Sequence, residues 1–285
     1  MIIIKIMGGL GNQMFQYAMY EKLKYLGKDV KVDRSSFYAQ DDLRKYELGV
    51  FKNLQPEKAE QDEIEHYLHQ ESLWEKALRK ALHSERKVYY LDGMFYDEKI
   101  YSIQEGYVEG FWQSEKYFSD IEKVIRQRFE FPKIQDAENE KFLSMIHQTH
   151  SVSIHVRRGD YLSETNQKIY GRICTLDYYK KAIRYFEEKY EDVTFFVFSN
   201  DLEWAKENLE MKKSCFVDCN TEETAIYDMY LMSECRDNII ANSSFSWWGA
   251  WMNSHEEKEV IAPSKWLNTV DVRDIWCEGW KKLDG

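Results

Sequence analysis

The sequence is poor in the residues that interrupt secondary structure or cross-link a chain. Its 285 residues include three prolines and five cysteines. Five is an odd number for disulfide pairing, and Cys215 and Cys219 have no second pair to complete a zinc site, so we expect all five to be reduced. No segment approaches the about 20 apolar residues of a membrane-spanning helix, and the apolar run after Met1 is too short for a signal peptide. We therefore expect a cytoplasmic protein without a transmembrane segment.

Basic residues are also in the minority. The chain has 39 lysines and arginines against 50 aspartates and glutamates, which gives a formal net charge of −11. Nucleic acids and anionic membranes are usually bound by basic surfaces, so neither is an expected partner. The length is enough for two domains with substantial cores. We place the boundary near residue 150, with an N-terminal domain at 1–150 and a C-terminal domain at 151–285.

Both halves begin with a strand and continue with alternating strands and helices, the pattern that builds a parallel sheet. In the first half, a buried strand at 2–6 is followed by the glycine-rich turn MGGLGNQ, a helix and a second strand at 30–32. In the second half, a strand at 151–157 is followed by a loop and by a helix that opens near Thr175, with Tyr179, Ile183 and Phe186 on one face. Further strands are expected at 193–198, 215–217 and 239–241, and the last one at 260–262. The pattern predicts an α/β protein with two Rossmann-type domains facing each other across a cleft.

Polar residues follow three predicted strands of the second half. The carboxyl ends of parallel strands meet at one edge of a sheet, so these residues are expected to converge. Paired arginine N–H groups bind anions, and small hydroxyl residues at the start of a helix expose N–H groups that bind phosphate. The three groups are His155, Arg157 and Arg158; Ser199, Asn200 and Asp201; and Asn242, Ser243, Ser244, Phe245 and Ser246.

Each of these signals also has a plainer interpretation. Adjacent arginines are commonly solvated or ion-paired, and hydroxyl residues before a helix commonly cap it. Asp201 is suited either to accepting hydrogen bonds from a guanine base or to capping the next helix. The sequence has no Asp-x-Asp triplet, and its histidine pairs do not fit a metalloprotease pattern. We therefore expect no metal, with the charge of a diphosphate met by Arg157, Arg158 and a helix N-terminus.

Five stretches together resemble the α-1,2-fucosyltransferases of glycosyltransferase family 11, in particular a bacterial member. They are GGLGNQMFQYA at 8–18, HVRRGDYL at 155–162, FSND at 198–201, DMYLMSEC at 228–235 and NSSFSWWGAW at 242–251. Weaker matches at 44–48 and 110–118 extend the resemblance over most of the chain. It implies metal-independent transfer of L-fucose from GDP-fucose to the 2-hydroxyl of a galactose in a glycan, with inversion and without a cofactor. The implied fold is the glycosyltransferase B type, with the N-terminal domain on the acceptor side and the C-terminal domain binding GDP-fucose.

The resemblance also implies roles for the residues at the strand ends. Arg157 would hold the β-phosphate of the donor, and Arg158 would support that loop or add a second contact. His155 and Asp201 would line the guanosine pocket, and the serines of the third group would face the phosphates. The substrate-binding residues expected on this basis are His155, Asn200, Asp201, Asn242, Ser243, Ser244, Phe245, Ser246 and Trp247.

Inversion by a single displacement requires a group that takes the proton of the acceptor hydroxyl, normally a carboxylate. Asp160 is the first candidate and Glu164 the second, although an aspartate beside two arginines is also suited to pairing with them. From the N-terminal domain, Asn12 and Gln13 are expected to face the cleft and bind substrate. The tryptophans Trp112, Trp247 and Trp248 are available to stack on a sugar or to pack in the core.

Two other functions fit parts of the pattern. In a nicotinamide-dependent dehydrogenase, Gly9 and Gly11 would form the dinucleotide turn and Asp33 would bind the ribose, but Met14 stands where a third glycine is required. A protein that binds a sugar nucleotide or glycan without turnover would use the same fold.

Overall fold

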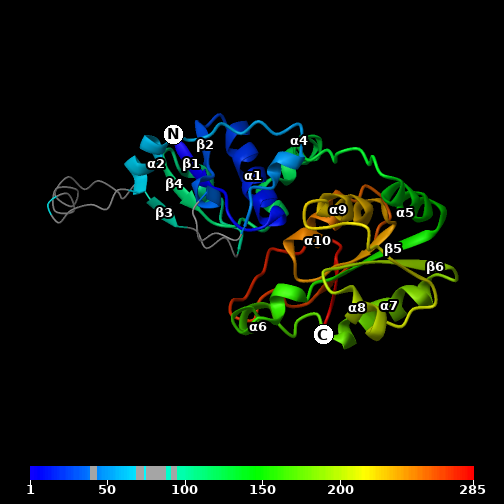
Figure 1. The fold of residues 1–285 in the computed structure, drawn as a ribbon. Helices are drawn as coiled ribbons and strands as arrows, with labels where there is room; N and C mark the ends of the chain where they lie inside the picture. Colours follow the sequence, from blue (N-terminus) through cyan, green and yellow to red (C-terminus); the bar gives the residue numbers. More distant parts are fainter. Residues whose placement is uncertain (39–43, 69–73, 75–87, 91–94) are drawn as a thin grey trace. The chain divides into compact units, whose positions relative to one another are not determined.

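The computed structural model describes residues 1–38, 44–68, 74, 88–90 and 95–285. The chain divides into two compact units, unit 1 at Met1–Phe129 and unit 2 at Glu130–Gly285. The division falls before helix α5 (Ala137–Gln148) rather than near residue 150, because α5 packs against helix α9 of unit 2. Each unit is an α/β structure with its own parallel sheet, as predicted (Figure 1).

Unit 1 is built on a four-stranded parallel sheet with the strand order β2-β1-β4-β3. Strand β1 is central because its three isoleucines at 2–4 are fully buried. The first turn contains Gly8 at φ +78°, a conformation that favours glycine, and α1 begins directly after it. The elements are β1 (Ile2–Lys5), α1 (Leu10–Tyr25), β2 (Val30–Asp33), α2 (Gln61–Leu68), β3 (Val88–Tyr90), β4 (Gly106–Glu109) and α4 (Glu122–Arg128), with short 3₁₀ turns at Ser35–Tyr38, Leu48–Val50, Glu98–Ser102, Glu115–Tyr117 and Ser119–Ile121.

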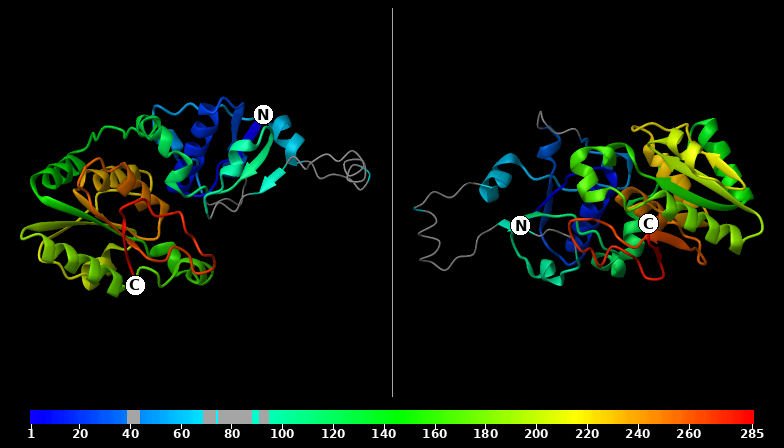
Figure 2. Two further views of the ribbon diagram at one scale, coloured as in Figure 1. Left: turned by 180° about the vertical axis from the view of Figure 1, so that it is seen from behind. Right: turned by 90° about the horizontal axis from the view of Figure 1, so that it is seen from below.

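Unit 2 contains a six-stranded parallel sheet with the order β10-β9-β8-β5-β6-β7. Helices α7 and α8 cover one face, and α5, α9 and α10 cover the other (Figures 1 and 2). After α5, its elements are β5 (His150–Val156), the 3₁₀ helix η6 (Gly159–Leu162), α6 (Glu164–Tyr170), α7 (Leu176–Lys189), β6 (Val193–Ser199), α8 (Leu202–Asn208), β7 (Ser214–Phe216), α9 (Ala225–Glu234), β8 (Asp237–Ile239), α10 (Ser244–Met252), β9 (Val260–Pro263) and β10 (Lys281–Leu283).

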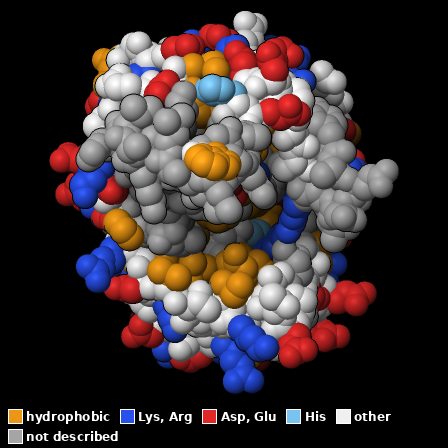
Figure 3. Space-filling model, turned by 90° about the vertical axis from the view of Figure 1, so that its left-hand side faces the viewer, with side chains coloured by type: hydrophobic (Ala, Val, Ile, Leu, Met, Phe, Trp, Pro, Cys, Tyr) orange, Lys and Arg blue, Asp and Glu red, His pale blue; other side chains and the backbone are white. Residues whose placement is uncertain are grey.

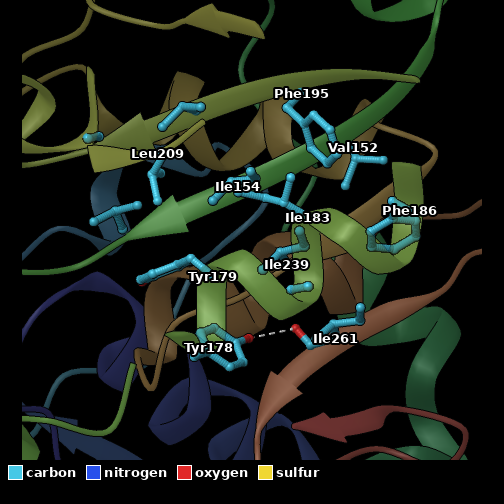
Figure 4. Packing of buried hydrophobic residues seen from close by; sticks show 14 of the residues in the cluster. Val152, Ile154, Tyr178, Tyr179, Ile183, Phe186, Phe195, Leu209, Ile239 and Ile261 are labelled. Atoms are coloured by element: carbon cyan, nitrogen blue, oxygen red, sulfur yellow. Dashed lines mark hydrogen bonds between the residues drawn. The ribbon is translucent and has the colours of Figure 1, made fainter. Parts of the chain in front are cut away.

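The core of unit 2 lies between β5 and α7. Val152 and Ile154 of β5 pack against Ile183 and Phe186 of α7, as Figure 4 shows. The alternate residues of β5 are polar but also buried, since α9 and α10 cover the second face. Ser153 Oγ there accepts a hydrogen bond of 2.7 Å from Asn238 Nδ2. Both faces of the strand are therefore enclosed, which fixes the position of the loop that follows it.

Two elements of unit 2 differ from the prediction. Residues after 163 form helix α6 rather than a loop, because Ser163 caps it by accepting from the Asn166 N–H. A further strand, β10, pairs with β9 at the edge of the sheet.

On the face shown in Figure 3, the acidic and basic side chains of the described residues are interspersed rather than gathered by sign. Within the described ranges, no helix is both long and apolar enough to cross a membrane.

Candidate functional site

The direction of the chain reverses at one point in the sheet of unit 2. From β5 the chain proceeds through β6 to β7, then returns to β8 on the other side of β5 and continues outward to β9. In parallel α/β sheets, such a switch point leaves a crevice outside the carboxyl ends of the strands, where ligands usually bind. Here the loop after β5 carries the two arginines, and the loop after β8 leads into α10. The topology therefore brings two of the three polar groups to one crevice.

The two arginines have different surroundings. Arg158 is tethered, because its Nε lies 3.0 Å from Asp201 Oδ2 and its guanidinium stacks 4.1 Å above the Trp204 ring. Arg157 is partly exposed at the very end of β5, with its guanidinium carbon 5.7 Å from the centre of the Tyr161 ring. Arg158 therefore fixes the loop, and the contact of Arg157 with the donor phosphate stays a prediction.

The loop after β6 holds the arginine loop in place. The Arg158 backbone N–H donates to Asn200 Oδ1 over 3.0 Å. Asp201 caps α8, since its Oδ1 accepts from the Trp204 N–H while its Oδ2 pairs with Arg158. The helix-cap interpretation of Asp201 is therefore confirmed, and its carboxylate already accepts two hydrogen bonds from the protein.

Helix α10 begins at the crevice with an N-terminus that carries no side-chain cap. Ser243, at the N-cap position, makes no capping hydrogen bond, and the first helical bond runs from the Trp247 N–H to the Ser243 carbonyl. Among the described side chains, none therefore caps the N–H groups of the first turn. Such groups, together with the helix dipole, favour an anion. Ser244 and Phe245 of this turn are partly exposed.

His155 lies near the carboxyl end of β5, at the switch point of the sheet. Its ring is 5% exposed and packs against Phe245, with ring centres 5.7 Å apart. Burial, helped by the charge of Arg157, lowers the pKa of His155 to about 3, so the ring is neutral near pH 7. Its Nδ1 is buried without a hydrogen-bond partner, which is unusual for a polar atom and consistent with a partner supplied by a ligand.

Several predicted contact residues have structural duties instead. Asn242 accepts from the Cys174 thiol and donates to the carbonyls of Tyr170 and Trp266, so its amide joins three loops. Ser246 and Trp247 are fully buried, and the indole of Trp247 donates to the Ile275 carbonyl. Their side chains do not reach solvent, so the expectation that these side chains contact sugar or phosphate gains no support from their burial. Trp112 and Trp248 are also fully buried, which leaves none of the three tryptophans able to stack on a sugar.

The two candidate bases differ in how they are presented. Glu164 opens α6 with a side chain that is 92% exposed and 3.6 Å from Lys168 of the next helical turn. The Asp160 backbone lies in η6, two residues beyond Arg158. The side chain of Asp160 lies outside the described part of the structure. Glu164 is thus an ordinary solvated helix residue, which does not favour it as the base.

Asp228, which the sequence did not single out as a site residue, also lies at this edge of the sheet. It occupies the first turn of α9, and the helix begins there after the chain leaves the carboxyl end of β7. Burial raises the pKa of Asp228 to about 7, and Asn220 Nδ2 donates to its Oδ1 over 2.7 Å. A carboxyl group with a pKa displaced so far marks a candidate functional residue. Its position in the motif DMYLMSEC was the only sequence signal.

The glycine-rich turn of unit 1 does not fit a dinucleotide site. The Glu47 carboxylate and the Arg44 guanidinium lie over Gly9, 3.8 and 3.9 Å from the place a β-carbon would take, so they occupy the space that a bound pyrophosphate would need. Asp33 is 2% exposed and its two oxygens accept from the Ser35 N–H and the Tyr107 hydroxyl. It is therefore not available to a ribose, and the dehydrogenase interpretation fails.

Gln13 is also structural. It is fully buried, and its amide donates to the carbonyls of Gly8 and Lys45 and accepts from the Glu47 N–H. Its polar atoms hold the Gly8 turn and the 45–47 segment together, so the prediction that Gln13 contacts substrate gains no support from these bonds. Asn12, by contrast, is partly exposed.

Within the described ranges there is no group of three or more histidine, cysteine, aspartate or glutamate side chains placed to hold a metal ion.

Two α/β units, each with a parallel sheet and one with polar side chains at its switch point, define a Rossmann-type fold. Comparison with known proteins gives the family. Residues 1–283 match the profile of glycosyl transferase family 11. The chain is 34% identical over 301 residues to an α-1,2-colitosyltransferase of Escherichia coli, covering 99% of each protein. The chain therefore belongs to glycosyl transferase family 11, as its motifs indicated.

Two more distant similarities accompany this match. Over 154 residues the chain is 29% identical to galactoside α-(1,2)-fucosyltransferase 1 of Ateles belzebuth, covering 51% of this chain and 42% of that protein. Among solved structures, a variant of Arabidopsis thaliana FUT1 in complex with GDP aligns with 91% of this chain and 69% of its own, at 13% identity and a TM-score of 0.49.

Proposed function

We propose that this protein is a metal-independent α-1,2-fucosyltransferase that moves L-fucose from GDP-β-L-fucose to the 2-hydroxyl of a galactose residue. The observation that carries the proposal is the crevice between β5 and β8, where Arg157 and the uncapped N-terminus of α10 lie next to the buried, neutral His155. This arrangement suits a diphosphate. The family membership and the name of the partial relative from Ateles belzebuth support fucose and galactose as the substrates.

The chemistry follows from where charge develops. The galactose oxygen attacks the anomeric carbon of fucose from the face opposite the diphosphate, the bond from that carbon to the diphosphate oxygen breaks, and GDP leaves with the bonding electrons. Arg157 and the first-turn N–H groups of α10 stabilise the charge that grows on the departing β-phosphate. His155 offers a hydrogen bond without adding charge. The proton of the acceptor hydroxyl passes to a carboxylate, for which Asp160 is the preferred residue.

The E. coli relative favours a second candidate for the donor. It is 34% identical over nearly the whole of both chains and is named an α-1,2-colitosyltransferase. Transfer of colitose from an activated nucleotide donor would use the same diphosphate crevice and the same displacement. The two candidates differ only in the sugar.

An acceptor screen tests the proposal. The protein is incubated with GDP-fucose, or with nucleotide-activated colitose, and a panel of galactose-terminated glycans. We expect GDP release that depends on the acceptor, and NMR should show a new α-1,2 linkage to galactose. Absence of transfer from both donors, or a β-linked product, would contradict the proposed function. Binding of GDP-fucose without any turnover would support the alternative of a sugar-nucleotide-binding protein.

A further inference from the structure

The sheet of unit 1 has a switch point of its own. From β1 the chain passes through α1 to β2 on one side, whereas β4 pairs with β1 on the other side, so the crevice lies between the carboxyl ends of β1 and β4. The last paired residues of these strands are Ile4 and Val108. Beyond these residues the two segments separate. The one after β1 leads into the Gly8–Gly9 turn, and the one after β4 leads into residues 110–113. This is a second place where the fold favours a ligand.

Hydrogen bonds of glutamine side chains join these two segments at two places. At the bottom, the fully buried Gln16 accepts from the Met7 N–H and donates to the Gly110 carbonyl. Beyond it, Gln113 Nε2 donates to Asn12 Oδ1 over 2.7 Å. Asn12 and Gln113 are both partly exposed. The first bridge closes the core, and the second presents an amide pair to the outside.

The chain adopts a strained conformation to place Gln113 there. The preceding residue, Trp112, has φ +48°, which is a rare and strained conformation for a bulky residue. Trp112 is fully buried, and no group in the described part of the chain accepts a hydrogen bond from its indole N–H. Such strain persists where the surrounding structure imposes it, and it occurs preferentially at ligand sites.

The polar groups at this edge match a neutral, hydroxyl-bearing ligand. The bond between the amides uses Gln113 Nε2 and Asn12 Oδ1, which leaves the Gln113 carbonyl to accept from a hydroxyl and the Asn12 amino group to donate to one. Glu47 and Arg44 both lie near Gly9, within 4 Å of the place a β-carbon would take. Opposite charges side by side attract neither a phosphate nor a cation strongly.

We propose that the Asn12–Gln113 amide pair binds hydroxyl groups of the acceptor galactose, which makes Gln113 a specificity-determining residue. The inference rests on the proposed function for the identity of the sugar. It adds a residue and a location, at the β1/β4 edge, to the expectation that the N-terminal domain binds the acceptor.

The test measures binding without turnover. Binding of methyl β-D-galactopyranoside is followed by saturation-transfer NMR in the presence of GDP, and binding of GDP by calorimetry. Gln113→Ala removes the acceptor oxygen, and Gln113→Glu keeps it but loses the N–H that bonds to Asn12 Oδ1. Each change should weaken galactoside binding about five- to tenfold, the effect of losing one hydrogen bond of the pair, and leave GDP affinity unchanged. The matched control is Gln104→Ala, an exposed glutamine just before the other end of β4, which should change neither.

The two measurements separate the possible failures. Unchanged galactoside binding in both Gln113 variants, or no galactoside binding by the wild-type protein, would overturn the inference about the amide pair. If the wild-type protein bound the galactoside but not GDP, the proposed donor and therefore the proposed function would fail instead. Thermal unfolding of each variant identifies any loss of binding that is due to loss of the fold.

Discussion

The neighbouring residues Arg157 and Arg158 are identical in type but differ in what holds them. The carboxylate of Asp201 and the ring of Trp204 constrain Arg158, and an arginine held in this way positions its loop. Arg157 lies at the crevice with part of its side chain exposed. Sequence alone made both arginines candidates for the phosphate contact, and the contacts of Arg158 show that it positions the loop.

Replacing Arg157 should therefore affect the reaction more than the fold. We expect Arg157→Ala to reduce transfer at least about a hundredfold, since a cation acting on developing charge contributes about 3 kcal/mol to lowering the barrier. Arg157→Lys should restore only part of the rate, because one ammonium replaces a two-pronged donor. Initial rates measured beside Arg184→Ala, an exposed arginine of α7, provide the control. Retention of more than about a tenth of the activity by Arg157→Ala would remove the phosphate role.

Two buried ionisable residues should give stability opposite dependences on pH. His155 has a pKa of about 3 when folded and 6.5 when unfolded, so the unfolded chain binds its proton first and stability falls as pH drops below 6.5. Asp228 has a pKa of about 7 when folded and 3.8 when unfolded, so its contribution falls as pH rises from 4 to 7. Each group changes the free energy of unfolding by about 1.4 kcal/mol per pH unit within its window, and the two nearly cancel.

Single substitutions should reveal these hidden contributions. Between pH 7 and pH 5, His155→Asn should gain about 2 kcal/mol of stability relative to the wild type, and Asp228→Asn should lose a similar amount. Urea unfolding at the two pH values measures both. Parallel curves for the wild type and the two variants would show that neither group titrates as assigned.

At the scale of elements, the loops after β5 and β6 form one unit. Asn200 accepts from the Arg158 N–H, and its side chain lies against Gly159. A β-carbon on Gly159 would come within 2.2 Å of Asn200 Nδ2, so only glycine leaves room for this bond. The exposed side chain of Asn200 can move, but moving it breaks the link between the loops.

Gly159→Ala should therefore weaken GDP binding more than it reduces stability. We expect an affinity loss of about five- to tenfold, the value of one lost hydrogen bond that orders the arginine loop, with a small change in the melting temperature. Asn200→Ala alone should cost about the same. Because both changes break the same link, the double variant should be no worse than either single one. Additive losses in calorimetry would show that the two residues act separately.

How far the sequence predicted these elements depends on the strength of the local pattern. The regular spacing of Tyr179, Ile183 and Phe186 predicted α7, and the apolar run at 193–198 predicted β6. Strand β10 consists of Lys281–Leu283, and these residues have no apolar pattern. Its strand conformation is therefore determined by pairing with β9 in the folded protein. The burial of Gln13 and Asn242 could not be predicted either. Amide side chains that form internal hydrogen bonds have the same residue type as amide side chains on the surface.

For the whole molecule, the acidic composition disfavours binding of an anionic diphosphate. With a net charge of −11, the protein must gather its positive groups locally to bind an anionic donor. In unit 2 these groups are Arg157 and the positive end of α10. Since they are part of the polypeptide, charge neutralisation of the donor should not require an added cation.

Activity should accordingly survive metal removal. We expect at least about nine-tenths of the transfer rate to remain in excess EDTA, a barrier change below about 0.1 kcal/mol. Assays with added Mn²⁺ or Mg²⁺ form the comparison. A rate that collapses in EDTA and returns with either ion would show that a metal shares the diphosphate charge.

The crevice between β5 and β8 is built wholly from unit 2. The groups proposed to bind the diphosphate all come from residues 155–245, and the Asn12–Gln113 pair belongs to the other unit. If the donor binds as proposed, its encounter with the enzyme needs no residue from the acceptor side. In terms of bisubstrate kinetics, the donor can then bind productively before any glycan is present, and GDP should compete with the donor at every concentration of acceptor.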